Sequence, residues 1–498
     1  MKKYRNLIDG KFSAPATGRY FENINPADNS DIIGLFPDSA EEDIDRAVRA
    51  AHNAFAYWSQ LPAPKRGDLI YNAGCLLMKK KESLAKVITW EMGKTMPESL
   101  GDIQSSIDVA YFMAGEGRRM YGQTTFSSLP KRWALTKRIP VGICGLITAW
   151  NAPMAIVTWK LFPALICGNT VVLKPSQESP LTAYLLGEIL KEAGFPPGVV
   201  NIVYGSGSKA AQALVKHPEV KLISFTGSTK VGQLISQECG RQMKKCSLEL
   251  GGKNGLIVMD DADLPAAAKA VVAGAFSTAG QRCASTSRIF VHRSIFEAFL
   301  TKLINETKLM KVGIGKDSDT KVCPIISRRQ FDKIMSYIEE AKKDGAKIIF
   351  GGKALKSGKF AKGNFIEPTI LTGVDIHSRI AQEEIFGPVL AVFKIKSLQE
   401  AIDKLNDVDY GLTASIFTSN INSAMYALER IEAGCCYVNA PTFGSEPHLP
   451  FGGLKNSGIG TREPGVQALD VFSELKTIYI DYSGISQNSQ YTNEKDKR

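Results

Sequence analysis

The spacing of apolar residues divides the chain into a helical first part and a longer part in which strands alternate with helices. The first helix is preceded by Ser39 and Glu42, which together form a capping-box signature. Further helical stretches are expected over residues 65–92 and 102–116. The apolar face of the first helix is formed by Ile44, Ala47, Val48, Ala51 and Phe55.

Residues 132–140 alternate between apolar and polar side chains, which is typical of an exposed strand. A strand that extends outside a globular core is a candidate for pairing with another subunit.

From residue 141 onward, short apolar runs alternate with helical patterns. The expected strands are Ile143–Ile147, Thr170–Lys174, Val199–Tyr204, Lys221–Phe225 and Cys246–Leu250. The expected helices between them are Met154–Cys167, Pro180–Ala193 and Thr229–Cys239. This alternation predicts an α/β fold with a Rossmann-like, doubly wound parallel sheet, whose ligand site lies beyond the carboxyl ends of the strands.

A second α/β run begins near Asn254. Its expected helices are Ala262–Thr278, Ser294–Met310 and Arg329–Asp344, and its expected strands are Arg288–His292, Lys347–Phe350 and Val389–Phe393. Residues 484–498 are expected to form a flexible tail, because the chain is polar from Gln487 onward.

Composition describes a soluble protein of two or three domains. The chain has 498 residues, of which 44% are hydrophobic. Residues 1–30 contain no apolar signal core, and the longest apolar stretch, residues 154–167, is too short to span a bilayer. We therefore expect a cytoplasmic protein that does not associate with membranes.

The charged, cysteine and histidine residues exclude several other classes. The net charge is +11, but the basic residues are spread along the chain, which favours a solvated basic surface over nucleic-acid binding. The nine cysteines include no C-x-x-C pair, and the five histidines show no ligand spacing. We expect reduced thiols and no metal site.

Two segments carry a nucleophile and a base. Cys283 lies among small residues in 277–285, and Glu249 is the lone carboxylate in 248–253, at the end of an apolar strand. A thiolate can attack a carbonyl carbon, and a carboxylate can then activate water against the resulting thioester. Taken singly, Cys283 could also be a small buried hydrophobe and Glu249 a partnered core acid.

Polar residues follow three further strands. Gly227 and Ser228 open a helix after a buried strand, where free backbone N–H groups suit a phosphate, and Lys174 ends another strand. Neither this segment nor Gly205-Ser206-Gly207-Ser208 has the G-x-G-x-x-G spacing, so each alone indicates only a tight turn; together they favour a nucleotide. Asn151 also follows a strand and either caps a turn or donates to an oxyanion.

The combination of motifs resembles the aldehyde dehydrogenase superfamily over residues 5–483. The matching stretches are 140–151, 173–175, 225–228, 248–253, 280–283, 383–388 and 450–458.

This resemblance implies a role for each matching residue. Cys283 would be the nucleophile, Glu249 the base and Asn151 the oxyanion donor. The cofactor, NAD or NADP, would be held by Ile147, Ala149, Trp150, Lys174, Ser176, Gln177, Gly207, Gly227, Ser228, Leu250, Glu384 and Phe386.

The resemblance also implies a domain organisation. Residues 1–121 and 141–250 would form the dinucleotide-binding domain, and residues 251–450 the catalytic domain. Residues 122–140 and 468–483 would form a small β oligomerisation element, consistent with a homodimer or homotetramer.

The residues after Lys174 depart from the pattern of many NAD-preferring members, which carry a glutamate three positions after this lysine. Here that position is Gln177, which would not repel a 2′-phosphate, and Ser176 and Lys174 could bind one. The sequence therefore favours a cofactor site that accepts NADP.

The substrate would be a small aldehyde, and a carboxylate-bearing semialdehyde is one candidate. Arg282 precedes the nucleophile and either binds that carboxylate or forms a salt bridge within the fold. Trp159, Phe443 and Phe451 would supply apolar walls, and Lys160 a further positive charge. The loop 439–450 resembles that of bacterial α-ketoglutaric semialdehyde dehydrogenases.

Two other functions stay open at this point. A basic pocket could equally bind a phosphate, as in a non-phosphorylating glyceraldehyde-3-phosphate dehydrogenase. A non-enzymatic or nucleic-acid-binding role fits poorly with the presence of nucleophile, base and amide together.

Overall fold

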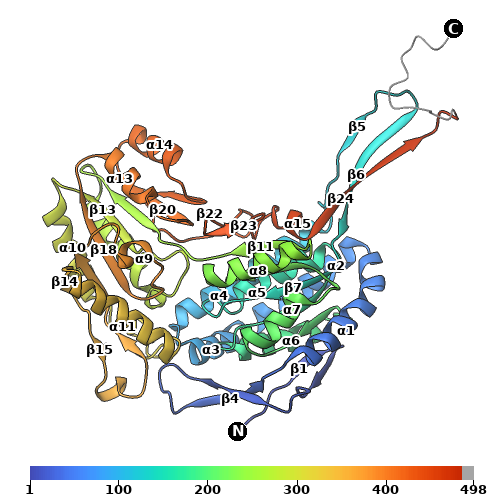
Figure 1. Cartoon of the computed structure of the whole chain (residues 1–498), viewed down its shortest axis with the longest axis horizontal. Coiled ribbons are helices and arrows are strands. Elements are labelled where there is room, and N and C mark those ends of the chain that lie inside the picture. The colour runs from blue at the N-terminus through green and yellow to red at the C-terminus, as the bar shows by residue number, and fades with distance from the viewer. Residues whose placement is uncertain (485–498) are drawn as a thin grey trace.

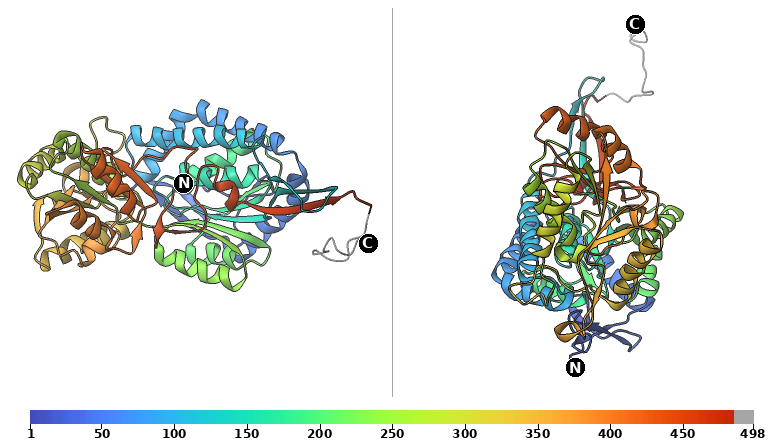
Figure 2. Two further views of the ribbon diagram at one scale, coloured as in Figure 1. Left: turned by 90° about the horizontal axis from the view of Figure 1, so that it is seen from above. Right: turned by 90° about the vertical axis from the view of Figure 1, so that its left-hand side faces the viewer.

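The computed structural model describes residues 1–484, and the tail expected from Gln487 onward lies outside the described residues. Two large sheets with helices against their faces lie next to each other, and a narrow arm of strands projects from one of them (Figure 1). Both views in Figure 2 show the same arm extending away from the body of the molecule.

An eight-stranded sheet carries the predicted doubly wound core, and its strand order is β2-β1-β9-β8-β7-β10-β11-β23. The five central strands are parallel, which confirms the predicted α/β class. In sheet order they are β9 (Val200–Ile202), β8 (Thr170–Lys174), β7 (Ile143–Ile147), β10 (Val220–Thr226) and β11 (Lys245–Glu249). The edge strands are β2 (Lys11–Ser13), β1 (Asn6–Ile8) and β23 (Gly458–Ile459).

Helices cover both faces of this sheet because successive strand residues point to opposite sides. In β8, Val171 and Leu173 pack into one core and Val172 into the other. The first core is shared with α2 (Ala63–Lys79), α3 (Lys81–Met92), α4 (Met96–Glu116), α5 (Ala155–Ile166) and α6 (Pro180–Glu192). The second core is shared with α1 (Glu41–Gln60), α7 (Gln212–Lys216) and α8 (Thr229–Arg241).

The second α/β run forms a seven-stranded sheet in which only the edge strand β14 (Lys347–Phe350) is antiparallel to its neighbour. The other strands are β17 (Thr369–Thr372), β18 (Val389–Ile395), β13 (Arg288–His292), β12 (Gly255–Val258), β20 (Thr413–Phe417) and β21 (Cys435–Val438). One face packs on α9 (Leu264–Phe276), α10 (Phe296–Lys308) and α11 (Arg328–Lys343), and the other on α13 (Leu398–Asn406) and α14 (Ile421–Arg430).

The arm is a three-stranded antiparallel sheet of β5 (Thr124–Phe126), β6 (Arg132–Pro140) and β24 (Ser473–Asp481). The exposed strand predicted over 132–140 is therefore present. Shorter elements complete the described chain: β3 (Tyr20–Ile24), β4 (Ile32–Pro37), β15 (Ala354–Leu355), β16 (Phe365–Ile366), β19 (Tyr410–Gly411), β22 (Leu454–Lys455), α12 (Arg379–Gln382) and α15 (Ala468–Val471).

Three local predictions were wrong. Ser39 does not cap the first helix: α1 begins at Glu41 after Ala40, and the Ser39 hydroxyl instead accepts a hydrogen bond from the Asn6 amide at 2.8 Å. The helical stretch expected over 65–92 is two helices, which meet at Lys80. The stretch expected from residue 102 begins at Met96, where Thr95 and Glu98 form the capping box.

The helix expected over Ala262–Thr278 ends at Phe276, just before the candidate nucleophile. Thr278 and Ala279 have left-handed backbone angles, with φ of 53° and 54°, and Gly280 follows at 67°. Such angles cost a residue with a side chain about 1–3 kcal/mol, so the surrounding contacts must hold this turn.

No helix within residues 1–484 is both long and apolar enough to cross a membrane. The predicted domain boundaries stay a prediction.

Candidate active site

The order of the central strands brings the predicted polar residues to one edge of the sheet. Strands β8, β7, β10 and β11 are neighbours and parallel, so their carboxyl ends lie together. Lys174, Thr226 and Glu249 are the last residues of β8, β10 and β11, and Asn151 follows β7 by four residues. The chain leaves β7 toward β8 and returns at β10 on the other side, which makes this edge a topological switch point where α/β proteins bind ligands.

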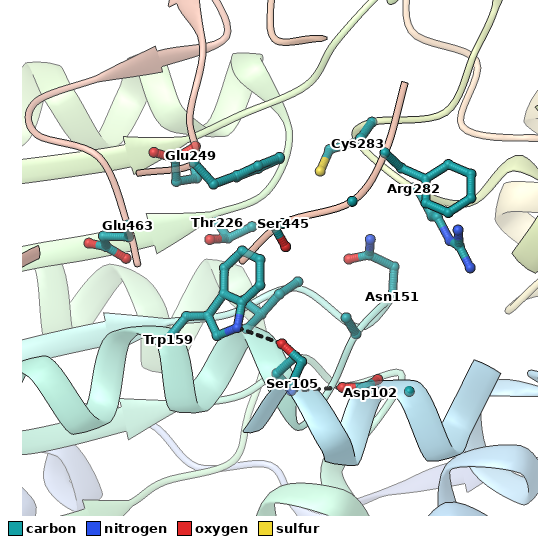
Figure 3. A pocket seen from close by; sticks show the side chains of 18 of the residues that line it. Asp102, Ser105, Asn151, Trp159, Thr226, Glu249, Arg282, Cys283, Ser445 and Glu463 are labelled. Atoms are coloured by element: carbon teal, nitrogen blue, oxygen red, sulfur yellow. Dashed lines mark hydrogen bonds between the residues drawn. The ribbon is translucent and has the colours of Figure 1, made fainter. Parts of the chain in front are cut away.

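A cavity of about 450 Å³ at this edge contains the predicted catalytic groups. Figure 3 shows Cys283, Asn151 and Glu249 around the same space, although they come from three separate segments. The four residues predicted to contact substrate also line it: Trp159, Arg282, Phe443 and Phe451. The Trp159 and Phe451 rings pack edge to face, with centroids 5.8 Å apart, and form an apolar wall.

Cys283 is held in its neutral thiol form by its surroundings. It is partly open to the cavity, but removal from bulk water raises the pKa of its thiol to about 12. The nearby carboxyl groups of Glu384 and Glu249 contribute to this rise, because a thiolate beside them would meet like charge.

Glu249 is buried, with 8% of its surface exposed, and its Oε2 atom has no hydrogen-bond partner among the described residues. Burial raises the pKa of this carboxyl well above its usual value, which the ammonium of Lys160 partly offsets. Gly452 allows this close packing, because a Cβ there would lie 2.6 Å from Glu249 Oε1. An unpaired carboxyl of raised pKa suits a base that takes a proton from water.

Two buried ion pairs fix the polar walls of the cavity. Lys160 Nζ lies 2.8 Å from Glu463 Oε2, and the other oxygen of Glu463 accepts hydrogen bonds from Ser224 and Ser247. Lys94 Nζ lies 3.0 Å from Asp102 Oδ2. Both lysines are therefore neutralised by partners within the chain.

Arg282 forms the salt bridge within the fold that was one of the two alternatives left open by the sequence, and it also lines the cavity. Its Nη2 atom lies 3.6 Å from Glu98 Oε1 and its Nε donates to Thr278 Oγ1 at 3.0 Å, so it does pair within the fold. It also lines the cavity, with its guanidinium 4.8 Å from the centre of the Phe443 ring. A guanidinium has five N–H donors, so donors remain for a ligand.

A second cavity of about 710 Å³ adjoins the first, and Thr226 lines both. Its lining includes seven residues predicted to bind the cofactor: Ile147, Ala149, Trp150, Lys174, Ser176, Gly207 and Gly227.

The second cavity fits a dinucleotide. Burial lowers the pKa of Lys174 to about 8, and no acidic side chain in the described chain pairs with it, so a hydroxyl or phosphate would provide the missing partner. Helix α8 starts at this cavity with no side chain capping its first N–H groups. Val231 and Leu234 of α8 are exposed and offer an apolar surface for a base.

Five predicted cofactor residues lie outside the lining of the second cavity. Leu250 lines the first cavity instead. Ser228 is the residue before α8, and Gln177 is half-buried in the loop after β8. Glu384 accepts a hydrogen bond from the Gly252 backbone at 3.1 Å, and Phe386 packs on the Trp150 ring at 5.2 Å. Phe386 therefore lies against a residue of the second cavity, and Glu384 contacts the segment that follows Glu249 and Leu250.

Several residues that line the first cavity were not predicted from the sequence. Glu98, Gly101, Asp102 and Ser105 of α4 line the first cavity, and Glu463 reaches it from a distant loop. On α4, polar residues recur at helical spacing, and this pattern could have indicated that one face of the helix lines a polar site. No sequence pattern around Glu463 predicts that its side chain lies at this cavity.

Within residues 1–484, no group of three histidine, cysteine, aspartate or glutamate side chains could hold a metal ion.

Comparison with known proteins agrees with this geometry. Residues 12–478 match the aldehyde dehydrogenase family. The alpha-ketoglutaric semialdehyde dehydrogenase of Bacillus subtilis (strain 168) is 42% identical over 477 residues, which are 96% of this chain and 98% of that protein.

Solved structures share the whole fold. Betaine aldehyde dehydrogenase from Staphylococcus aureus, in complex with NAD+, has a TM-score of 0.95 and 35% identity, with 98% of this chain and 97% of that chain covered. A 3,6-anhydro-L-galactose dehydrogenase in complex with NADP has a TM-score of 0.93 and 34% identity, with coverages of 96% and 100%. With a family match over nearly all of its length and a thiol, a carboxyl and an amide around one cavity, the chain belongs to the aldehyde dehydrogenase family.

Proposed function

We propose that the chain oxidises a small aldehyde bearing a carboxylate, with Cys283 as the nucleophile, Glu249 as the base and Asn151 as the oxyanion donor. The observation that carries this proposal is the position of all three side chains around one cavity, which shares a wall residue, Thr226, with the second cavity. Family membership makes the chain an NAD(P)-dependent aldehyde dehydrogenase; the residue roles and the substrate class are our inference.

In the first step the Cys283 thiol gives its proton to solvent water, and the resulting thiolate adds to the aldehyde carbon, which forms a carbon–sulfur bond and a thiohemiacetal oxyanion. The Asn151 amide donates a hydrogen bond to this oxygen, and loss of such a donor typically costs about 2.7–4 kcal/mol of barrier. Bound NAD(P)+ supplies the acceptor for the hydride that leaves this carbon. The carbonyl then reforms as a thioester on Cys283.

Hydrolysis completes the cycle. Glu249 takes a proton from water as the water oxygen attacks the thioester carbon, and the carbon–sulfur bond breaks to give the acid and the Cys283 thiolate. The burial that raises the pKa of Glu249 increases its affinity for this proton.

Arg282 is our candidate for the group that binds the substrate carboxylate. Lys94 and Lys160 are already paired with Asp102 and Glu463, whereas Arg282 keeps N–H donors beyond those that bind Thr278 and Glu98. The name of the Bacillus subtilis relative describes a semialdehyde with a carboxylate, which supports this choice. Glyceraldehyde 3-phosphate is not favoured, because both lysines that line the described cavity are in short, buried ion pairs, which leaves Arg282 as the main cation for a doubly charged phosphate.

For the cofactor, we infer that the site accepts NADP as well as NAD. Lys174 and Ser176 line the second cavity, and Gln177 beside them carries no negative charge to repel a 2′-phosphate.

We also propose that the arm pairs with another copy of the chain. Phe126, Trp133 and Ile480 lie opposite one another across its three strands, so they form an exposed apolar row on one face. Strands β5 and β24 leave unpaired edges, which commonly pair with a second chain.

All nine cysteines are in described residues and none forms a disulfide, which supports a reducing compartment, and we propose the cytoplasm.

Cys283→Ala should abolish aldehyde oxidation, and Glu249→Gln should slow steady-state turnover by about a hundredfold or more because water loses its base. The Glu249→Gln protein should still release one equivalent of NAD(P)H rapidly and accumulate an acyl adduct on Cys283. Stopped-flow absorbance and intact-protein mass spectrometry measure these two results. Full steady-state turnover by Glu249→Gln would remove Glu249 from the role of base.

Arg282→Gln should raise KM for an aldehyde with a distal carboxylate by about tenfold or more, because a hydrogen bond to a charged group is lost. With pentanal, which has no charge, kcat/KM should stay within about threefold. Arg328→Gln is the matched control, since it removes the same charge from an exposed position on α11. Equal losses with both aldehydes would show that Arg282 supports the fold and not carboxylate binding.

Gln177→Glu should weaken NADP binding by about tenfold or more and leave NAD binding nearly unchanged, because the new carboxylate repels only the 2′-phosphate. Isothermal titration calorimetry with each nucleotide tests this, with Gln60→Glu on exposed surface as the control. An unaltered protein that binds NADP a hundredfold more weakly than NAD would contradict the proposal.

Sedimentation equilibrium should give a mass of two or four times the 54.2 kDa chain. Trp133→Glu should shift the distribution toward smaller species, because it places a charge in the apolar row of the arm. A single-chain mass for the unaltered protein at micromolar concentration would exclude the proposed assembly.

A further inference from the structure

Glu98 lies in the first turn of α4, and its side chain leaves that helix to contact the turn that precedes Cys283. Its Oε1 atom accepts hydrogen bonds from the Thr278 backbone N–H at 2.6 Å and from the Thr278 hydroxyl at 3.1 Å. Its Oε2 atom accepts from the backbone N–H and the hydroxyl of Thr95, at 3.1 and 2.9 Å. The side chain is only 13% exposed, and these four bonds use the acceptor capacity of a carboxylate.

The turn that Glu98 contacts is strained. Thr278, Ala279 and Gly280 adopt three successive left-handed conformations, which residues with a side chain disfavour. Thr278 and Ala279 are completely buried. The turn also packs closely against a neighbouring loop, since a Cβ on Gly280 would lie 2.2 Å from the Gly387 carbonyl oxygen. A strained conformation persists only where the surrounding contacts favour it.

Two side chains provide those contacts from opposite ends of the turn. Glu98 binds its start at Thr278. Gln281 binds its end, because its amide donates to the carbonyls of Thr278 and Pro324 at 3.1 Å and its oxygen accepts from the Ile326 N–H at 2.9 Å. Of the two, only Glu98 comes from the helices packed on the eight-stranded sheet, which is the part of the molecule that also carries Asn151 and Glu249.

Glu98 also orients Arg282 through Thr278. The Thr278 hydroxyl donates to Glu98 Oε1 and accepts from Arg282 Nε at 3.0 Å, so the three side chains form a continuous chain of hydrogen bonds. Arg282 Nη2 lies a further 3.6 Å from the same Glu98 oxygen. The residue immediately before Cys283 is thus fixed by the same carboxylate as the start of the turn.

We propose that Glu98 is a positioning residue, which holds the 278–280 turn and thereby fixes the Cys283 thiol relative to Asn151 and Glu249. This inference rests on the proposed role of Cys283 as the nucleophile. Without the Glu98 oxygen, the buried Thr278 N–H loses its acceptor and the turn relaxes toward ordinary backbone angles. A displacement of about 1 Å at a reacting group can reduce the rate about a hundredfold.

The main comparison is between Glu98→Ala and Glu98→Gln. Both remove the negative charge, but only glutamine keeps an oxygen that can accept from Thr278. With propanal, kcat should fall about a hundredfold in Glu98→Ala and by no more than about tenfold in Glu98→Gln, with KM within about threefold in both. The burst rate of NAD(P)H formation, per Cys283 thiol titrated with iodoacetamide, reports the same difference at the acylation step.

Two further variants separate positioning from helix stability. Thr95→Val removes a donor to the other Glu98 oxygen, so it should lower Tm through the weakened cap but leave kcat within about twofold. Thr278→Val keeps the backbone N–H but removes the hydroxyl that donates to Glu98 Oε1, and with it one of the two hydrogen bonds by which Glu98 holds the turn, so it should lower kcat about tenfold. If Glu98→Ala does not fold, the positioning role is tested by the other three variants, and the same kcat limits apply to Glu98→Gln, Thr278→Val and Thr95→Val.

Four outcomes would overturn the inference: Glu98→Ala within threefold of the unaltered kcat, Glu98→Gln as impaired as Glu98→Ala, Thr278→Val within twofold of the unaltered kcat, or Thr95→Val as impaired in kcat as Thr278→Val. Cys283→Ala is measured in parallel. Turnover by that protein would refute the proposed nucleophile, and this inference with it, whereas an inactive Cys283→Ala beside a fully active Glu98→Ala refutes the positioning role alone.

Discussion

The chemistry of this protein depends on ionisable side chains that are buried with few partners. Burial raises the pKa of the Cys283 thiol to about 12 and that of the Glu384 carboxyl to about 7, and it raises the pKa of Glu249 well above its usual value. The carboxyls of Glu384 and Glu249 also disfavour a thiolate on Cys283, because it would meet like charge. The cavity is therefore built to carry little negative charge before a ligand arrives, and any nearby positive charge favours the thiolate.

Most of the cations that line the cavity are already paired with acidic side chains. Lys160 is paired with Glu463 and Lys94 with Asp102, and removing one member of such a buried pair would leave an uncompensated charge. These pairs connect the C-terminal part of the chain and α4 to the rest of the cavity wall. Arg282 pairs with Glu98 and lines the cavity with N–H donors remaining, which is why we propose it as the group that binds a substrate carboxylate.

Close backbone approach is the second requirement of the site. Gly452 lies so near Glu249 that any side chain there would meet the carboxylate, and a Cβ on Gly280 would lie even nearer the Gly387 carbonyl oxygen. These glycines let the segment before Cys283, the loop with Glu384 and the C-terminal loop converge on one small volume. The strained turn at Thr278 is a consequence of that convergence, because the chain must reverse within a few buried residues.

The sequence by itself determined where the main strands form and which kinds of reactive side chain the protein carries. Apolar spacing predicted the five central strands of the eight-stranded sheet to within one or two residues, but it did not predict β12, β17, β20 and β21. Lys174 and Glu249 were predicted as site residues because each is a charged residue at the end of an apolar strand. The small, flexible residues around Cys283 also indicated this cysteine as a candidate nucleophile. The sequence pattern misjudged Ser39, whose hydroxyl is bound by Asn6, a residue more than thirty positions away.

Only the tertiary structure decided which of these groups meet, and which partners they keep. Glu98 reaches Thr278 across 180 positions and Glu463 reaches Lys160 across 303, and no local pattern encodes either contact. The same holds for charge: Arg282, Lys94 and Lys160 look alike in the sequence, but only packing determines which of them is neutralised. Local periodicity records which face of an element is buried, whereas the partner on that face depends on how distant segments fold together.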